Sequence, residues 1–201
     1  KIKDEYRITS LFDSLEFIDN STLTIIFSFG LMAFLDQILN KFLVNAFEKL
    51  PIESLQTLCA QIPHPIVLVG GKEEKEDGDQ LVSLDSSRIV NTCGTYSLHE
   101  SALIVSKARV VLSHDTGMLY IACAFEKNVI AIWGAPSPAL QVEPLMPSDS
   151  NAKVFQSIVP DLSCQPCSNF GTKTCPKGHF ACMKKQDLPE IVRQVAEMWT
   201  A

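Results

Sequence analysis

The chain has 201 residues, of which 46% are hydrophobic and 20% are charged, and this balance excludes a globally disordered protein. Its formal net charge of −6 is the opposite of the basic surplus typical of nucleic-acid-binding proteins, so we expect no nucleic-acid partner. The length favours one domain, or one domain plus a fragment.

The first 48 residues contain the most apolar stretch of the chain, at residues 23–47. Polar and charged side chains interrupt it, and its unbroken apolar runs are shorter than the roughly 20 residues that a membrane-spanning helix needs. We expect a buried strand and a helix here, with membrane contact as the alternative. Because residues 1–48 do not show the alternation of strands and helices that the later sequence shows, we interpret them as an N-terminal remnant or linker.

From residue 49 onward, apolar strands and amphipathic helices alternate. Helices are expected at residues 51–62, 72–84, 97–107, 117–126 and 188–199. Strands are expected at residues 65–69, 89–90, 109–112 and 129–133. Ser97 and Glu100 have the spacing of a capping box. The alternation predicts an α/β fold for residues 49–201, a Rossmann-like doubly wound parallel sheet, with a cysteine-rich tail at residues 160–185 before the last helix.

One candidate site is the sequence Ser113-His114-Asp115-Thr116-Gly117, between a predicted strand and a predicted helix. Ligands of open α/β sheets bind beyond the carboxyl ends of the strands, and the N–H groups at a helix start attract anions. The backbone of Thr116, Gly117 and Met118 is therefore suited to a diphosphate. The alternative is that Asp115 only caps the helix, as aspartate often does, and the spacing leaves both interpretations open.

A second candidate is the segment at residues 70–74, which follows another apolar strand. An acidic side chain at this place could accept hydrogen bonds from ribose hydroxyls. Alternatively, Glu73, Glu74, Glu76 and Asp77 form only a solvated helical turn that the helix dipole favours. The sequence contains neither a G-x-G-x-x-G dinucleotide fingerprint nor a P-loop.

Four motifs in this order resemble glycosyltransferase family 9, the family of lipopolysaccharide heptosyltransferases. They are VLVGG at 67–71, NTCGTYSL at 91–98, SHDTG at 113–117 and IAIWGAPSP at 130–138, joined by the tail motifs LSCQPC at 162–167 and CPKGH at 175–179. The resemblance covers residues 49–200. It implies the C-terminal, donor-binding half of a GT-B glycosyltransferase, in which two Rossmann-like domains face one cleft. It also implies inverting transfer of a sugar, often heptose from ADP-heptose, with no required metal.

The resemblance implies donor-binding roles at the turn before the helix at 117–126. Asp115, Thr116 and Gly117 match the family's donor motif, and Met118 and Tyr120 of the following helix are counted with them. The family usually has a histidine where this chain has Tyr120. A phenol still donates a hydrogen bond, but it cannot become a cation near neutral pH.

Further roles follow from the same resemblance. Lys49 matches a lysine that faces the phosphates, where a cation would stabilise the charged leaving group. Glu74, or in second place Glu73, matches an acid that binds ribose, and Tyr96 stands where a residue lies against the base. For His114 we expect a supporting or surface role.

No catalytic residue is expected in this chain, because the general base of the family belongs to an N-terminal domain that has no counterpart in the sequence. The implied partners are a nucleotide-diphosphate sugar donor and a lipid-linked glycan acceptor, such as lipopolysaccharide, held by the missing domain. We expect a cytoplasmic protein, because the cysteines favour a reducing compartment and no signal peptide opens the chain. Peripheral association with the cytoplasmic face of the inner membrane is compatible with this. The alternative function is a non-catalytic nucleotide-binding or interaction module of the same fold.

The tail offers enough thiolates for one tetrahedral zinc ion, namely Cys164, Cys167, Cys175 and Cys182. The second pair is spaced by six residues rather than two to four, so reduced thiols that pack an irregular tail are the alternative to a structural zinc. A zinc ribbon that binds nucleic acid is disfavoured by the acidic charge. Three other cysteines lie in apolar patterns and are expected to be buried: Cys59, Cys93 and Cys123.

Overall fold

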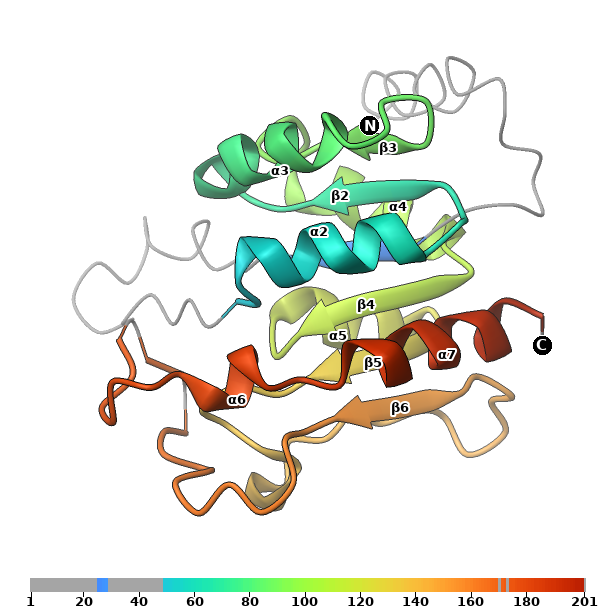
Figure 1. The fold of residues 1–201 in the computed structure, drawn as a ribbon. Helices are drawn as coiled ribbons and strands as arrows, with labels where there is room; N and C mark the ends of the chain where they lie inside the picture. The colour runs from blue at the N-terminus through green and yellow to red at the C-terminus, as the bar shows by residue number, and fades with distance from the viewer. Residues whose placement is uncertain (1–24, 29–48, 170, 173, 201) are drawn as a thin grey trace.

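The computed structural model describes residues 25–28, 49–169, 171–172 and 174–200 (Figure 1). In this part of the chain, six strands form one sheet in the order β3-β2-β1-β4-β5-β6, and every pair of neighbours is parallel. The strands are β1 (Ile25–Ser28), β2 (Ile66–Val69), β3 (Ile89–Asn91), β4 (Val110–His114), β5 (Asn128–Ile132) and β6 (Val154–Ser157). The predicted doubly wound parallel sheet is therefore confirmed.

Strand β1 lies in the middle of the sheet and pairs with β2 on one side and β4 on the other. The strand expected in the apolar N-terminal stretch is confirmed, but the boundary expected at residue 48 is wrong for residues 25–28. These residues are a central strand of the domain rather than part of a linker, because both edges of β1 are hydrogen-bonded. The helix expected after this strand lies outside the described residues.

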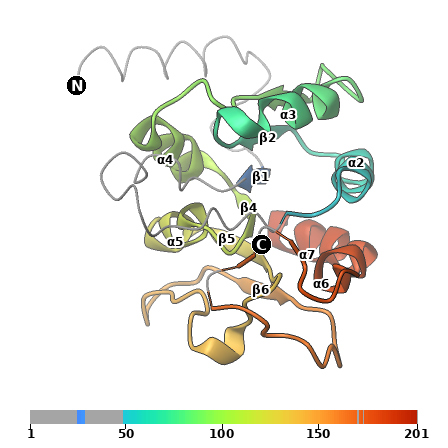
Figure 2. The same cartoon turned by 90° about the vertical axis from the view of Figure 1, so that its left-hand side faces the viewer.

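Helices cover both faces of the sheet (Figure 2). One group consists of α2 (Ile52–Gln61), α3 (Lys75–Val82) and α7 (Leu188–Trp199), and the other of α4 (Leu98–Lys107) and α5 (Gly117–Ala124). Shorter helices are η2 (Lys72–Glu74), η3 (Pro138–Leu140) and α6 (Ala181–Lys184). Among the described residues, no helix combines the length and the apolarity that crossing a membrane requires.

Alternate side chains of β2, β4 and β5 enter two separate apolar cores. Leu68 and Leu112 lie in the cluster that α2 and α7 cover, which we call the first core. Val67 and Val111 lie in the cluster that α4 and α5 cover, the second core. Because both faces of the strands are buried, the strands are apolar at nearly every position, and this explains why they could be predicted from continuous apolar runs.

The predicted elements from residue 49 onward are largely confirmed. The capping box is formed, because Ser97 N–H donates to Glu100 Oε2 at 2.7 Å and Glu100 N–H donates to Ser97 Oγ at 3.4 Å. The helix expected at 72–84 is divided into η2 and α3. Strand β6 was not predicted. It is a half-buried edge strand, and its hydrogen bonds come from β5, far back along the chain, so its residues carry little local signal.

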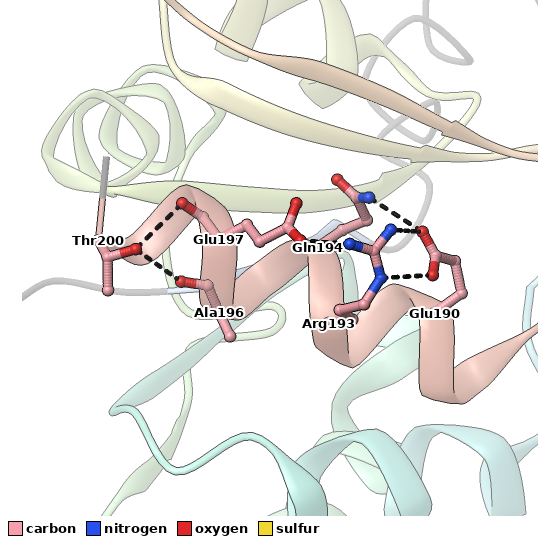
Figure 3. Close-up of polar contacts among 6 residues, drawn as sticks. All are labelled: Glu190, Arg193, Gln194, Ala196, Glu197 and Thr200. Carbon is pink, nitrogen blue, oxygen red and sulfur yellow. Dashed lines mark hydrogen bonds and ion pairs between the residues drawn. The ribbon is translucent and has the colours of Figure 1, made fainter.

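The outer face of α7 carries a network of exposed polar contacts (Figure 3). Arg193 forms ion pairs with Glu190 and Glu197, and the Gln194 amide donates to Glu190 at 2.9 Å. The hydrogen bonds from Arg193 lower the pKa of Glu190 to about 2. Ion pairs at such exposed positions contribute little to stability, so the packing of α7 depends on its apolar face, which enters the first core.

The chain that leaves β5 is held in place by the buried side chain of Gln186. Its Nε2 donates to the carbonyl oxygens of Trp133 at 3.0 Å and Cys182 at 2.7 Å. Its Oε1 accepts a hydrogen bond from Ser157 Oγ at 2.6 Å. One amide therefore joins the ends of β5 and β6 to the cysteine-rich tail.

Replacing Gln186 with alanine should lower the free energy of unfolding by about 1–3 kcal/mol, because two carbonyl groups and a hydroxyl lose their partner in the interior. Urea unfolding measures this loss. The matched control is Gln194→Ala on the polar face of α7, for which we expect a change within about 0.5 kcal/mol. A loss no larger than that of the control would contradict the role of Gln186.

Candidate functional site

The candidate site lies at the edge of the sheet where the strands end. Because the strands are parallel, the loops after β2, β3, β4 and β5 all leave from this edge. The order of the strands reverses between β1 and β4. Such a reversal leaves a crevice outside the carboxyl ends of the strands, and open α/β sheets bind their ligands there. The turn from β4 into α5 stands at this point.

The turn between β4 and α5 presents an open helix start to the crevice. Thr116 is the N-cap residue, with φ −140° and ψ 167°, and its side chain makes no capping hydrogen bond. The N-cap is therefore not Asp115, and the alternative that Asp115 only caps the helix is wrong. A Cβ built on the exposed Gly117 would meet no atom of the described residues within 4 Å outside its own helical turn, so space remains beside the main chain at the start of the helix.

The carboxylate of Asp115 is held by Tyr120 from the next turn of α5. The Tyr120 hydroxyl lies 2.9 Å from Asp115 Oδ1 and 2.9 Å from the carbonyl oxygen of Val142, so one proton serves two acceptors. Burial raises the pKa of Asp115, and the hydrogen bond from Tyr120 opposes this rise. Burial and the neighbouring Asp115 raise the pKa of Tyr120. The hydroxyl thus supports the Asp115 carboxylate, a role that the sequence did not indicate.

Lys49 is brought to the same edge by a hydrogen bond of its neighbour. The N–H of Leu50 donates to Nε2 of His114 at 3.1 Å, and the His114 side chain is buried. Because Nε2 accepts, a neutral His114 ring carries its proton on Nδ1. The Lys49 ammonium forms an ion pair with Asp77 of α3. Of the two alternatives expected for His114, the surface position is wrong, because the buried ring anchors the segment next to Lys49.

The loop after β2 places its two candidate acids differently. Glu74 is 3% exposed, and its Oε2 accepts a hydrogen bond from the N–H of Gly71 at 2.8 Å. Burial raises the pKa of Glu74, whereas the Gly71 N–H and the charge of Lys49 lower it, so Lys49 and Glu74 act on each other. Glu73 is exposed. The resemblance ranks Glu74 first as the ribose-binding acid. In the structure, however, the side chain that a ligand can reach from solvent is that of Glu73.

The loops after β2 and β3 are joined beside the site. Gly94 has a φ of +68°, and its N–H donates to the carbonyl oxygen of Gly70 at 2.9 Å. A Cβ at Gly94 would lie 2.9 Å from the Cα of Lys72, so both the backbone conformation and the space require glycine. Tyr96 follows in this loop, half-buried against the second core.

The four tail cysteines do not share one site in the described residues. Cys182 is 7% exposed and lies in the first core. Cys164 instead lies near His179, with Sγ and Nε2 3.9 Å apart. Within the described ranges, no group of three or more ligating side chains could hold a metal ion. The structure thus provides no preformed geometry for zinc bound by Cys164, Cys167, Cys175 and Cys182, and zinc stays a prediction.

The other three cysteines are buried free thiols, as predicted. Burial raises the pKa values of Cys59 and Cys93 to about 12, so neither is a thiolate near neutral pH. Burial also raises the pKa of Cys123. These residues therefore act as small apolar side chains of the core.

The strand order and the site at its reversal define a Rossmann-like α/β domain. Solved glycosyltransferases of the GT-B type contain this architecture in half of their chain. The match to Escherichia coli ADP-heptose lipopolysaccharide heptosyltransferase II has a TM-score of 0.64 at 14% identity and covers 100% of this chain and 52% of that one. The match to an Escherichia coli heptosyltransferase solved with ADP has a TM-score of 0.58 at 15% identity. It covers 90% of this chain and 46% of that one.

The sequence model of glycosyltransferase family 9 (heptosyltransferase) matches residues 53–176, which is more than half of the chain. The chain therefore belongs to glycosyltransferase family 9, as its motifs predicted. A curated relative, lipopolysaccharide heptosyltransferase 2 of Salmonella typhimurium, is 24% identical over 79 residues, 37% of this chain and 23% of the relative. The chain spans about half the length of the solved proteins that it matches.

Replacing Asp115 with asparagine should stabilise the protein near neutral pH. Burial raises the pKa of this carboxyl above its ordinary value of 3.8, so the folded state binds the proton more tightly than the unfolded chain does. The ionised carboxylate therefore lowers stability as the pH rises above about 4. Asparagine keeps an acceptor for Tyr120 without the charge. Urea unfolding from acid to neutral pH should show that the advantage of the variant grows with pH, and a constant difference would contradict the assignment.

Proposed function

We propose that this chain is the donor-binding half of a heptosyltransferase-type enzyme and binds a nucleoside-diphosphate sugar, such as ADP-heptose, at the end of β4. The observation that carries the proposal is the open start of α5 at Gly117, with the Lys49 ammonium at the same edge of the sheet. Family membership and the fold shared with a heptosyltransferase solved with ADP support it.

The diphosphate would lie on the first turn of α5. Backbone N–H groups and the helix dipole favour negative charge at this place, and Gly117 lets a phosphate approach the main chain closely. Lys49, which lies at the same edge of the sheet, would supply a cation. As the sugar is transferred, negative charge builds up on the leaving diphosphate, and both groups stabilise it. Strand β4 fixes the two groups together, since α5 starts after it and His114 anchors the Lys49 segment.

The Asp115 carboxylate would accept hydrogen bonds from hydroxyl groups of the donor sugar. Because Tyr120 already orients this carboxylate, little reorganisation is needed when the donor binds. Ribose would lie at the Glu73–Glu74 turn, with the more exposed Glu73 as the first contact, and the base against Tyr96. Met118, which is buried in the second core, contributes through its main chain.

Sugar transfer with inversion needs a general base that deprotonates an acceptor hydroxyl on the face opposite to the diphosphate. We assign this base, and the binding of a lipopolysaccharide or related lipid-linked glycan acceptor, to a second Rossmann-like domain of the family. Peripheral contact with the cytoplasmic face of the inner membrane belongs to the same proposal, since a lipid-linked acceptor resides there. This chain supplies the donor site, and none of its described residues is assigned as the base.

Thermal unfolding with and without ADP tests the proposal. ADP should raise the Tm, because a ligand at about 100 times its Kd adds about 2.7 kcal/mol of stability to the folded state. Asp115→Ala and Gly117→Ala should both abolish most of this shift. The Gly117 variant is the more informative one, because a Cβ there would clash with none of the described residues outside its own helical turn, so a lost shift reports on the ligand site rather than on the fold.

The control for the ADP experiment is Asp149→Ala, an exposed aspartate in the turn before β6, which should keep the full shift. Absence of any shift with ADP and with other nucleoside diphosphates would refute the donor site. A normal shift combined with no sugar transfer by the full-length polypeptide would identify a non-catalytic nucleotide-binding module instead.

A further inference from the structure

The cation proposed for the diphosphate is neutralised within the chain itself. The ammonium group of Lys49 pairs with the carboxylate of Asp77, in the first turn of α3. The side chains are 39% and 30% exposed, so both groups remain in contact with water. A phosphate that enters the crevice therefore meets an ion pair at this place, with one negative charge beside the positive one.

Further carboxylates lie close to Asp77 in the sequence. Glu73 and Glu74 precede Asp77 in η2, and Glu76 lies next to it in α3. The charge of Lys49 lowers the pKa of Glu74, which shows that the ammonium also acts on this second acid. The acidic side of the crevice would repel a diphosphate unless Lys49 turns toward the ligand.

We propose that Asp77 is an exchangeable counter-ion of Lys49. The nucleoside diphosphate displaces the Asp77 carboxylate when it binds, and the carboxylate takes the ammonium back when the nucleoside diphosphate leaves. Asp77 thereby weakens the binding of the diphosphate product and speeds its release after transfer. This inference rests on the proposed function, since it concerns the same diphosphate site.

The exchange is energetically favourable because the two competitors differ in charge. A partly exposed lysine–carboxylate pair is weak, because water screens its charges, so it is easily exchanged. A diphosphate carries more negative charge than one carboxylate and presents several acceptor oxygens to the three donors of the ammonium.

The exchange also needs little structural change. The main chain next to Lys49 is fixed by the bond from Leu50 N–H to His114 Nε2. The four-carbon stem of lysine lets the ammonium move without the backbone. The movement is thus confined to one flexible side chain, while the sheet edge and the start of α5 remain in place.

The test compares the binding of ADP and of adenosine to Asp77→Asn by calorimetry. Asparagine is nearly isosteric but carries no charge, so the Lys49 ammonium loses this counter-ion. The variant should bind ADP about three- to tenfold more tightly than the wild type, with a slower dissociation rate. Adenosine, which has no phosphate, should bind both proteins equally.

The structure offers a matched control in the same helix. Asp79 forms an ion pair with Lys75 at 3.0 Å within α3 and accepts a hydrogen bond from the Asn91 amide of β3 at 2.7 Å, which asparagine at position 79 can still accept. Asp79→Asn removes the same charge from a neighbouring position and should leave the affinity for ADP unchanged. An equal gain in both variants would show that only the overall charge of the domain matters, and would overturn the proposal.

A double-mutant cycle with Lys49→Met distinguishes exchange from simple repulsion. Without the ammonium, Asp77→Asn should no longer increase the affinity for ADP. An undiminished gain in the Lys49→Met background would overturn the proposal, as would unchanged or weaker ADP binding by Asp77→Asn alone. Failure of the wild type to bind ADP would overturn the donor site as well. Wild-type binding without a gain in Asp77→Asn refutes the counter-ion role only.

Discussion

Strand β4 pairs in parallel with β1 on one side and with β5 on the other, and the candidate site depends on this pairing. The parallel direction brings the loops that follow the strands to one edge of the sheet. The position of β4 next to β1 places its last residues at the reversal of strand order, where open α/β sheets bind their ligands. The start of α5 is therefore fixed by the sheet at this place.

Two adjacent residues at the end of β4 organise the groups around this opening. The His114 ring accepts a hydrogen bond from the N–H of Leu50, the residue after Lys49, and the Asp115 carboxylate accepts one from the Tyr120 hydroxyl. Burial of Asp115 raises its pKa, so its ionised form lowers stability at neutral pH. A buried carboxylate that lowers stability when it is ionised is typical of functional sites, where the demands of binding conflict with the stability of the fold.

Much of the domain could be predicted because its signals are local. Strands buried on both faces are continuous apolar runs, as at residues 66–69, and helix starts such as Ser97 carry their own capping groups. Other features depend on contacts between distant segments. The ring of His64 stacks on Trp199 with centroids 3.7 Å apart, and Lys49 pairs with Asp77 across 28 positions of the sequence. Local periodicity contains no information on such pairs, so Asp77 could be read only as one acid of a solvated turn.

The sequence by itself determined the alternation of strands and helices and membership of glycosyltransferase family 9, and it marked the turn at 113–117 as a candidate site. These properties follow from apolar spacing and from short ordered motifs, which act over a few residues. Only the tertiary structure decided that β1 is a central strand, that Glu74 is buried while Glu73 is exposed, and that Cys182 packs in the core. The reason is physical: burial, pairing and charge neutralisation depend on which distant segments the fold brings into contact.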